Sequence, residues 1–406
     1  MTMASAQWLT IVGLGEEGIN GLPPVALDAI QNAEVLVGGY RHLSKVKDAK
    51  AKKCSWGKNL ESGIDAVSEN IGRRVVVLAS GDPMHFGIGS RLVQRFGIET
   101  MTIIPAPSAF SLAAARLGWS TPEVECITVH GRPLEAVNLY LYPNAKLLIL
   151  SWDGTTPAKL ARLLVAKGYP DSQITTFEHM GGKKERIVKN IAAEWKSQKL
   201  SALNTISVEC LAGPNATVWS RVPGLPESAF QHDNMITKYE VRAATIAALS
   251  PLPNEFFWDV GAGSGAIAIE WLRLVPSARA IAIESKKTRF NFIRANARNL
   301  GVPNLEIVAG RAPDVFKKIQ GNPNSIFVGG GVSDINLMLA CWNRLQLHGK
   351  LVANAVTLQT QEALLKLREK WGGKITKFSI AHESPIGRFS SLQPLMEVWQ
   401  LRAEKK

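Results

Sequence analysis

The segment WDVGAGSGAIAIEW, residues 258–271, constrains the fold of this chain more than any other. It reads as the end of an apolar strand, a glycine loop and the start of a helix. Glycine at 261, 263 and 265 lets the backbone turn tightly and approach a ligand, because no Cβ atom stands in the way. The helix that follows offers free N–H groups and the positive end of its dipole to an anionic group. Such a loop can hold NAD, a nucleotide or S-adenosylmethionine.

Two acidic residues narrow that choice. Asp259, ahead of the first glycine, is unfavourable beside a pyrophosphate but suits the cationic amino group of S-adenosylmethionine. Glu284 ends the strand-like segment RAIAIE, where a carboxylate can accept both hydroxyls of a ribose. NAD and S-adenosylmethionine both contain ribose, so Glu284 does not separate them. Asp259 and the spacing G-x-G-x-G, in place of G-x-G-x-x-G, favour S-adenosylmethionine, and a plain strand-to-helix turn is the alternative.

The chain has 406 residues, which is too long for one ordinary domain. Strand-like and helix-like segments alternate throughout, as in an α/β protein, and the continuous apolar strands predict mostly parallel sheets. Proline and glycine without any periodicity mark a boundary between residues 212 and 234. We expect a first domain over residues 1–225, with subdomains at about 1–120 and 121–215, and a Rossmann-like domain over residues 230–406.

The net charge of +13 is unevenly distributed. Residues 236–406 carry 23 Lys and Arg against 13 Asp and Glu, whereas residues 1–235 carry 24 against 21. A basic half attracts nucleic acid, an anionic membrane or a small molecule with many carboxylates, although a solvated lysine-rich face is the alternative. No apolar run reaches the roughly 18 residues of a membrane span, and the four cysteines lack the spacing of a metal site or a disulfide framework. We therefore expect a cytoplasmic protein with no metal site and no membrane partner.

Further segments of the second half accompany the glycine loop: NMITKYEVRA (234–243), GRAPD (310–314) and VGGG (328–331). Together they resemble the C15-methylating, decarboxylating enzymes of cobalamin biosynthesis. Arg311 stands where that family often has aspartate, so a contact from this side chain to adenine is not implied. The resemblance implies S-adenosylmethionine contacts from Thr237, Gly261, Ala262, Gly263, Ser264, Gly265, Glu284 and Ala312, in addition to Asp259.

The first half contains VGLGEEGINGLPPVALDAI, GGYRHL, SGDPMHFG, PAPSAFSLAAARLGW, HGRP and GGKKERIV. These segments resemble the tetrapyrrole methylases, and the first of them resembles the C5-methylating branch. That family binds S-adenosylmethionine with a different fold, in a cleft between two α/β subdomains. The match implies cofactor contacts from Gly81, Asp82, Ser108 and Ala109. It also implies that the loop VGLGEEG borders the tetrapyrrole trough and does not bind a nucleotide.

Both halves together resemble the family of precorrin C5,15-methyltransferases (decarboxylating). The resemblance implies methylation of precorrin-6B at C5 by the first domain and at C15 by the second, with decarboxylation of the C12 acetate to give precorrin-8X. It further implies one S-adenosylmethionine site per domain, a polycarboxylate tetrapyrrole as substrate, no nucleic-acid partner and a homo-oligomer. A nucleic-acid (RNA) methyltransferase using the second domain is the alternative function, and a dehydrogenase is a weaker one.

Substrate binding draws on basic and glycine residues of the second half. Lys238, Arg242 and Arg388 are candidates for binding substrate carboxylates, since arginine does so bidentately, although solvation of a helix surface is the alternative for each. Methyl transfer to an electron-rich carbon depends on positioning and desolvation, and the sequence shows no convincing catalytic constellation. Gly329, Gly330 and Gly331 end a strand and let a flat ring approach the backbone.

Overall fold

The computed structural model describes residues 7–57, 60–196 and 198–406. It divides into two compact units, and the division follows the chain except for one short segment. The first unit holds the residues up to Arg132 together with Tyr142–Thr217, and the second holds Pro133–Leu141 together with Val218–Lys406. Among the described residues, none of the helices has the length and apolar character that crossing a membrane requires.

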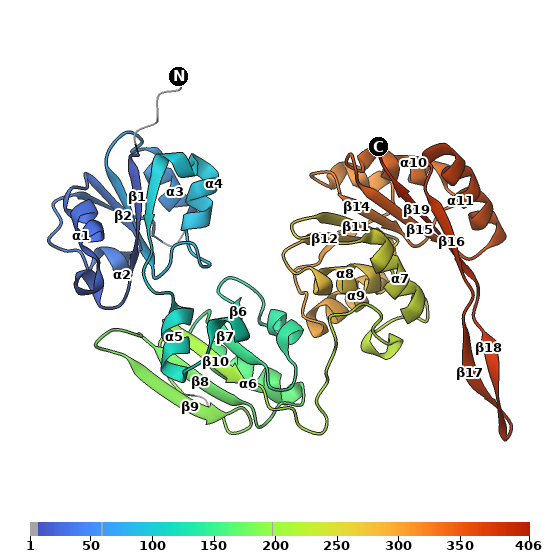
Figure 1. The fold of residues 1–406 in the computed structure, drawn as a ribbon, viewed down its shortest axis with the longest axis horizontal. Helices are drawn as coiled ribbons and strands as arrows, with labels where there is room; N and C mark the ends of the chain where they lie inside the picture. The colour runs from blue at the N-terminus through green and yellow to red at the C-terminus, as the bar shows by residue number, and fades with distance from the viewer. Residues whose placement is uncertain (1–6, 58–59, 197) are drawn as a thin grey trace. The chain divides into compact units, whose positions relative to one another are not determined.

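The first unit begins with a fully parallel sheet of order β3-β2-β4-β1-β5. Alternate residues of its strands face opposite sides, so Val76 and Leu78 pack in one apolar cluster and Val75 and Val77 in another. Helices α1 and α2 cover the first side, and α3 and α4 cover the second (Figure 1). The elements are β1 (Leu9–Leu14), α1 (Pro24–Gln31), β2 (Val35–Gly38), α2 (Tyr40–Leu43), β3 (Lys52–Ser55), α3 (Leu60–Ser68), β4 (Val75–Ser80), α4 (Gly89–Phe96) and β5 (Met101–Ile104).

The second sheet of this unit has the order β6-β7-β10-β8-β9. Only β6 and β7 run parallel, and the other three pairs are antiparallel, so the prediction of mostly parallel sheets is wrong here. The apolar residues of β10 are buried on both faces, and such a strand gives no sequence signal of its direction. The elements are α5 (Ala109–Leu117), β6 (Glu125–Thr128), β7 (Lys146–Leu150), α6 (Thr156–Ala166), β8 (Gln173–Glu178), β9 (Arg186–Ile191) and β10 (Asn204–Glu209).

The second unit contains a seven-stranded sheet of order β13-β12-β11-β14-β15-β19-β16. All neighbours run parallel except β19, which is antiparallel to β15 and β16, so the sheet is Rossmann-like. The strands are β11 (Phe256–Val260), β12 (Arg279–Glu284), β13 (Glu306–Ala309), β14 (Ser325–Val328), β15 (Lys350–Ala355), β16 (Lys374–Phe378) and β19 (Val398–Glu404).

Helices cover both faces of this sheet (Figure 1). Phe257 packs with the helices of one face, whereas its neighbours Trp258 and Val260 pack with those of the other. One face carries α7 (Tyr239–Leu249), α8 (Ala266–Leu274) and α9 (Lys287–Asn299), and the other carries α10 (Ile335–Arg344) and α11 (Leu358–Trp371). A two-stranded hairpin of β17 (Ala381–Ile386) and β18 (Phe389–Pro394) extends from the sheet.

Candidate active site

A cavity of about 940 Å³ lies at the carboxyl ends of β11, β12 and β14 in the second unit. The loops after these strands form its walls, together with the segment 234–238 before α7. The chain runs from β11 to β12 and β13 on one side, and its next strand, β14, lies on the other side of β11. Ligands of open α/β sheets bind at such a switch point, because the loops diverge there and leave a crevice.

The glycine loop between β11 and α8 forms one wall of the cavity. Gly263 has a φ of +59°, and a Cβ added there would meet only the Met235 carbonyl oxygen, at 3.6 Å, among the described residues. Gly263 therefore presents bare backbone to the cavity. Gly265 does not line it, although it was predicted to contact the cofactor. Its added Cβ would lie 3.1 Å from Ile293, so this glycine allows α8 and α9 to pack closely.

Asp259 lies at the end of β11, is 1% exposed, and lines the cavity. Its Oδ2 atom accepts a hydrogen bond from the backbone N–H of Ala268, at 3.1 Å, in the first turn of α8. Its Oδ1 atom is buried and has no hydrogen-bond partner among the described residues. Burial raises the pKa of Asp259 to about 7. The site therefore holds an acceptor that a cationic ligand would satisfy.

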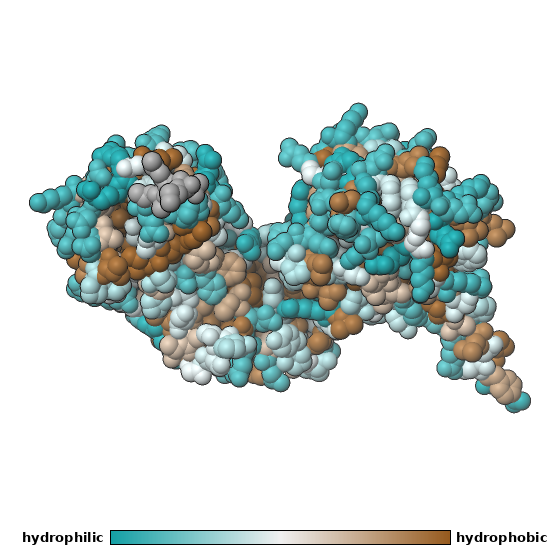
Figure 2. Space-filling model, turned by 45° about the horizontal axis from the view of Figure 1, so that its top comes forward, coloured by the Kyte–Doolittle hydropathy of each residue, from teal (hydrophilic) through white to brown (hydrophobic). Residues whose placement is uncertain are grey.

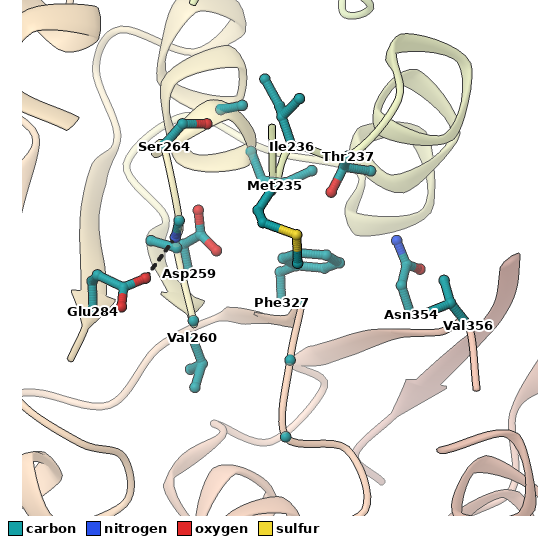
Figure 3. Close-up of a pocket in the computed structure, with 18 of the residues that line it drawn as sticks. Met235, Ile236, Thr237, Asp259, Val260, Ser264, Glu284, Phe327, Asn354 and Val356 are labelled. Carbon is teal, nitrogen blue, oxygen red and sulfur yellow. Dashed lines mark hydrogen bonds between the residues drawn. The ribbon is translucent and has the colours of Figure 1, made fainter. Parts of the chain in front are cut away.

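Glu284 ends β12 and is 4% exposed. Its Oε2 atom accepts from the Gly263 N–H at 2.8 Å, the contact drawn as a dashed line in Figure 3. Its Oε1 atom accepts from the N–H groups of Ser285 and Lys286, both at 2.8 Å. Arg289 lies 3.7 Å from the same carboxylate. Three backbone donors thus hold the carboxylate in one orientation at the cavity wall.

The structure brings most of the other predicted residues of the second domain to the same cavity. Arg311, the departure from the family pattern, also lines it. An added Cβ at Gly330 would meet none of the described atoms within 4 Å, which leaves room beside that backbone. The predicted residues in the lining, besides Asp259, Gly263 and Glu284, are Thr237, Lys238, Gly261, Ala262, Ser264, Ala312, Gly329, Gly330 and Gly331.

Arg242 does not contact the cavity, and its prediction as a carboxylate-binding residue is wrong. Its side chain is fully buried, and its Nε atom donates to Glu270 Oε1 at 2.7 Å. It also donates to the carbonyl oxygens of Thr237 and Leu225. A helical position for Arg242 does not show which face of the helix is covered by its neighbours. In the structure, α8 carries Glu270 and covers the face of α7 on which Arg242 lies. Arg242 therefore forms a structural ion pair with Glu270 beside the site.

Arg388 is also absent from the cavity lining. It lies in the turn between β17 and β18, with its guanidinium 5.0 Å from the ring centre of Phe389. The hairpin carries the residue away from the carboxyl ends of the parallel strands. A role for Arg388 in binding substrate at this cavity is not supported by its position.

Many residues of the cavity lining were not predicted from the sequence, among them Met235, Phe327, Asn354 and Val356. Figure 3 shows Asp259, Ser264 and Glu284 on one side of the Met235 and Phe327 side chains, and Asn354 and Val356 on the other. Asn354 could have been predicted from the sequence as a site residue, because it is an amide within the buried apolar strand KLVANA. The cavity therefore extends from the polar glycine loop to a second region beside Asn354 and Val356, where only Thr237 was predicted.

In the first unit, the predicted cofactor contacts come from two adjacent loops. Gly81 follows β4 with a φ of +54°, and an added Cβ would lie 3.0 Å from the Pro107 carbonyl oxygen. Ser108 caps α5 by accepting from the Ser111 N–H at 3.1 Å, and Ala109 is the first residue of that helix. Asp82 accepts from the Met84 N–H at 2.8 Å. The four predicted residues are thus close together in space.

Hydrogen bonds between charged side chains fix the position of the loop VGLGEEG. Glu16 accepts hydrogen bonds from Arg41, Lys45 and His179, the last at 2.9 Å. Burial alone would raise the pKa of Glu16, but the hydrogen bonds from Lys45 and His179 and the charge of Arg41 lower it to about 2. His179 follows β8, so Glu16 joins the first sheet of this unit to the second.

Two family models match the chain. Residues 8–195 match the tetrapyrrole (corrin/porphyrin) methylases, and residues 228–405 match the precorrin methyltransferase domain. The precorrin-6Y C(5,15)-methyltransferase (decarboxylating) of Sinorhizobium sp. is 40% identical over 394 residues, which cover 97% of this chain and 95% of that protein. The chain belongs to the precorrin-6Y C5,15-methyltransferase family.

The precorrin-6Y C(5,15)-methyltransferase (decarboxylating) of Mycobacterium tuberculosis strain H37Rv is 36% identical to this chain over 403 residues, which cover 98% of this chain and all of that protein. The crystal structure of the C-terminal domain of the Rhodobacter capsulatus precorrin-6Y C5,15-methyltransferase is 37% identical. It covers 46% of this chain and 100% of that domain, with a TM-score of 0.44. The identities of 40% and 36%, over 97% and 98% of this chain, confirm the resemblance to this family.

Precorrin-6Y C5,15-methyltransferases take their methyl groups from S-adenosylmethionine, and the second-unit cavity fits this cofactor. The unpartnered Oδ1 atom of Asp259 suits its amino group. The bare backbone of Gly263 leaves room for its carboxylate near the start of α8. The fixed carboxylate of Glu284 suits its ribose.

Proposed function

We propose that this enzyme methylates precorrin-6B (precorrin-6Y) at C5 and C15 and decarboxylates the C12 acetate side chain, giving precorrin-8X in cobalamin biosynthesis. The first unit methylates C5, and the second methylates C15 and decarboxylates. The two halves match different methyltransferase families, which supports this division. The names of the full-length relatives, which carry both positions and the decarboxylation, support the combination.

The observation that carries the proposal is the arrangement of Asp259 and Glu284 about the glycine loop. One carboxylate offers an unused buried acceptor, and the other is fixed by three backbone N–H groups. Such preformed polar groups orient a bound cofactor with little loss of entropy. When bound, S-adenosylmethionine supplies a methyl group on a sulfonium centre.

The residues of the cavity have two further tasks. Met235, Phe327 and Val356 present apolar surface, which excludes water from the reacting atoms. Lys238, Lys286 and Arg311 are exposed at the cavity and supply positive charge for the carboxylates of the substrate. Positioning and desolvation, and not a proton-transfer triad, then lower the barrier to methyl transfer.

The names of the relatives refer to precorrins, which favours a tetrapyrrole substrate over the RNA alternative. The basic charge of the second half serves a polycarboxylate as well as a nucleic acid. We retain the proposal that the enzyme works in the cytoplasm without a nucleic-acid partner. Fractionation of the native cell, and a gel shift with tRNA at low salt, test the two parts of this proposal.

A homo-oligomer is supported by the β17–β18 hairpin. Ile386, Phe389 and Leu392 are 63%, 67% and 70% exposed on it. Apolar side chains, brown and tan in Figure 2, lie near the tip of this hairpin at the lower right. Exposed apolar surface of this kind is typical of a protein–protein contact, and a second copy of the chain is the partner we propose.

We propose the functional boundary between Thr217 and Val218, earlier than the predicted 225–230. Glu270 accepts from the N–H groups of Gly224 and Leu225, at 2.7 and 3.0 Å. A cut at 225–230 would remove these donors from a buried carboxylate. A second domain that starts at residue 218 keeps them.

The test uses the full chain with Gly263→Asp. Aspartate tolerates the left-handed backbone better than most residues, and the added Cβ has space, so the fold should persist. Its charge repels the carboxylate of the cofactor, whereas Gly263→Asn has nearly the same shape without the charge. Native enzyme should give a product with two added methyl groups and one carboxyl group fewer, by mass spectrometry. Gly263→Asp should give one added methyl and no carbon dioxide.

Gly263→Asn serves as the control for shape and should retain more of both second-unit activities than Gly263→Asp. If Gly263→Asp still releases carbon dioxide at the native rate, the second unit does not perform this chemistry. Binding of S-adenosylhomocysteine should fall from two molecules per chain to one in Gly263→Asp.

A further inference from the structure

Three neutral polar side chains, from α7, β15 and β19, meet beside the cavity, and one of them, Asn354, lines it: the three are Thr245, Asn354 and Gln400. The Thr245 hydroxyl donates to the Val241 carbonyl at 2.7 Å, so its oxygen is left as an acceptor. Asn354 Nδ2 and Gln400 Nε2 both donate to that oxygen, at 3.2 and 2.9 Å. Gln400 Nε2 also donates to Asn354 Oδ1 at 2.9 Å. The neighbours therefore determine which end of the Asn354 amide is oxygen and which is nitrogen.

This network leaves part of Asn354 available to a ligand. Thr245 and Gln400 are buried, at 0% and 4% exposure, whereas Asn354 is half-buried and lines the cavity. A carboxamide has two N–H donors and two oxygen lone pairs. One donor and one lone pair of Asn354 are used, so one N–H and one lone pair are left. Asn354 thus presents a fixed neutral donor to the cavity.

Apolar side chains line the cavity on the strands next to Asn354. Asn354 pairs with Gln400 across the sheet, and Phe378 pairs with Val398 on the neighbouring strands. Val356, Phe378 and Val398 line the same cavity. Figure 3 places Asn354 and Val356 on the opposite side of Phe327 from Asp259 and Glu284. A substrate group beside Asn354 therefore lies away from the cofactor half and against apolar side chains.

We propose that Asn354 binds the substrate carboxylate that is lost as carbon dioxide. This inference rests on the proposed function of the second unit. As the carbon–carbon bond breaks, the negative charge leaves the carboxylate and spreads into the macrocycle. A lysine or arginine partner would stabilise the starting carboxylate more than the transition state and would slow the step. A neutral amide orients the carboxylate with a smaller ground-state stabilisation, and the apolar wall limits its hydration.

The step balances without any redox partner. The bond between the acetate methylene and the carboxyl carbon breaks, carbon dioxide leaves, and the electron pair enters the conjugated macrocycle. A proton from water then adds to the methylene carbon and leaves a methyl group. Asn354 holds the breaking bond in one orientation relative to the ring, and Gln400 and Thr245 act as positioning residues for its amide.

The experiment follows carbon dioxide released per methyl group transferred to C15, using the full chain, precorrin-6B and S-adenosylmethionine. Asn354→Ala should lower this ratio by about tenfold or more, because the carboxylate is then no longer held in the orientation that aligns the breaking bond with the ring. A C15-methylated product that retains its carboxyl group should accumulate. Gln400→Met, which frees the Asn354 amide, should lower the ratio by less. Asn304→Ala, the same change at an exposed position outside the cavity lining, should leave it unchanged.

Two internal measurements separate a chemical role from a structural one. Methylation of C5 by the same chain and the binding of S-adenosylhomocysteine should stay at native values in Asn354→Ala. The inference is overturned if Asn354→Ala keeps the native ratio, or if cofactor binding and C15 methylation fall together while the ratio holds. If the native chain itself releases no carbon dioxide, the proposed function fails, which is a different result from an unchanged ratio in Asn354→Ala.

Discussion

Burial makes the protonation state of Asp259 depend on the groups beside its carboxylate. With a pKa of about 7 it is largely protonated in the empty site at mildly acidic pH. A cationic amino group beside Oδ1 would favour the carboxylate form, so binding should release a proton. This proton release is expected below pH 7, where the amino group of the ligand itself stays protonated.

We therefore predict that the second unit binds S-adenosylhomocysteine more tightly as the pH rises towards 7. Affinity should improve by about tenfold for each pH unit below the pKa of Asp259. Asp259→Asn should bind more weakly and without this pH dependence. Calorimetry of both proteins isolates the effect, because the first-unit site is common to the two. Equal pH dependence in native protein and Asp259→Asn would refute the assignment of the titrating group.

The same residue makes a prediction about stability. The folded state keeps the Asp259 proton up to a pH of about 7, whereas the unfolded chain loses it near the ordinary value of 3.8. Stability of the empty enzyme should therefore fall as the pH rises through this range. Asp259→Asn removes the penalty and should raise the free energy of unfolding at pH 8 by up to a few kcal/mol, with little effect at pH 4. Denaturant titrations at the two pH values measure the difference.

Arg242 makes a third prediction at this scale. Arg242→Ala leaves the Glu270 carboxylate buried at 1% exposure without its cation, and frees the Thr237 carbonyl at the cavity wall. The free energy of unfolding of the second unit should fall by about 3–5 kcal/mol. Lys238→Ala, at an exposed position four residues earlier, should change it by no more than about 0.5 kcal/mol. Similar losses in both variants would show that Arg242 is not a buried structural partner.

At the scale of elements, the β17–β18 hairpin extends from the seven-stranded sheet of the second unit, and that sheet buries little of it. Every residue of β18 is exposed, and Ile386 pairs with Phe389 at the turn. A two-stranded hairpin alone is only marginally stable in water. Contact with a second copy would bury its apolar side chains and stabilise it.

The prediction is that Ile386→Ser combined with Phe389→Ser reduces the oligomer to smaller species in sedimentation or light scattering. Ser391→Ala on the same strand should leave the assembly unchanged. Binding of S-adenosylhomocysteine should persist in all variants, since neither Ile386 nor Phe389 lines the cavity. An unchanged mass in the double variant would exclude the hairpin as the contact.

At the scale of the whole molecule, the uneven charge predicts different salt dependence of the two methylations. The second half carries 23 basic against 13 acidic residues, so it attracts a polycarboxylate more strongly than the first half does. Raising the salt from about 0.05 to about 0.3 M shortens the screening length and should lower kcat/KM for C15 methylation more than for C5 methylation. A substrate with esterified carboxylates should lose this difference. Parallel slopes for the two reactions would contradict the electrostatic role of the second half.

The cofactor half of the second-unit site was largely predictable from the sequence. Asp259, Gly263 and Glu284 lie in a strand–loop–helix segment and at the end of the next strand, and local rules place such residues at one sheet edge. The resemblance of both halves to known families could be stated from short segments for the same reason. Strand direction in the β6–β10 sheet was not predictable, because β7, β8 and β10 are buried on both faces and lack the alternation that would reveal it.

The sequence by itself therefore determined the two α/β halves, the cofactor and the loop that we propose binds it, because these depend on contiguous residues. The tertiary structure alone decided that Arg242 is buried against Glu270 and that Asn354 faces the cavity. Gln400 meets Thr245 across 155 residues of chain. Contacts of that kind arise only when α7, β15 and β19 pack together, and no local pattern of residue types encodes which polar side chains will then meet.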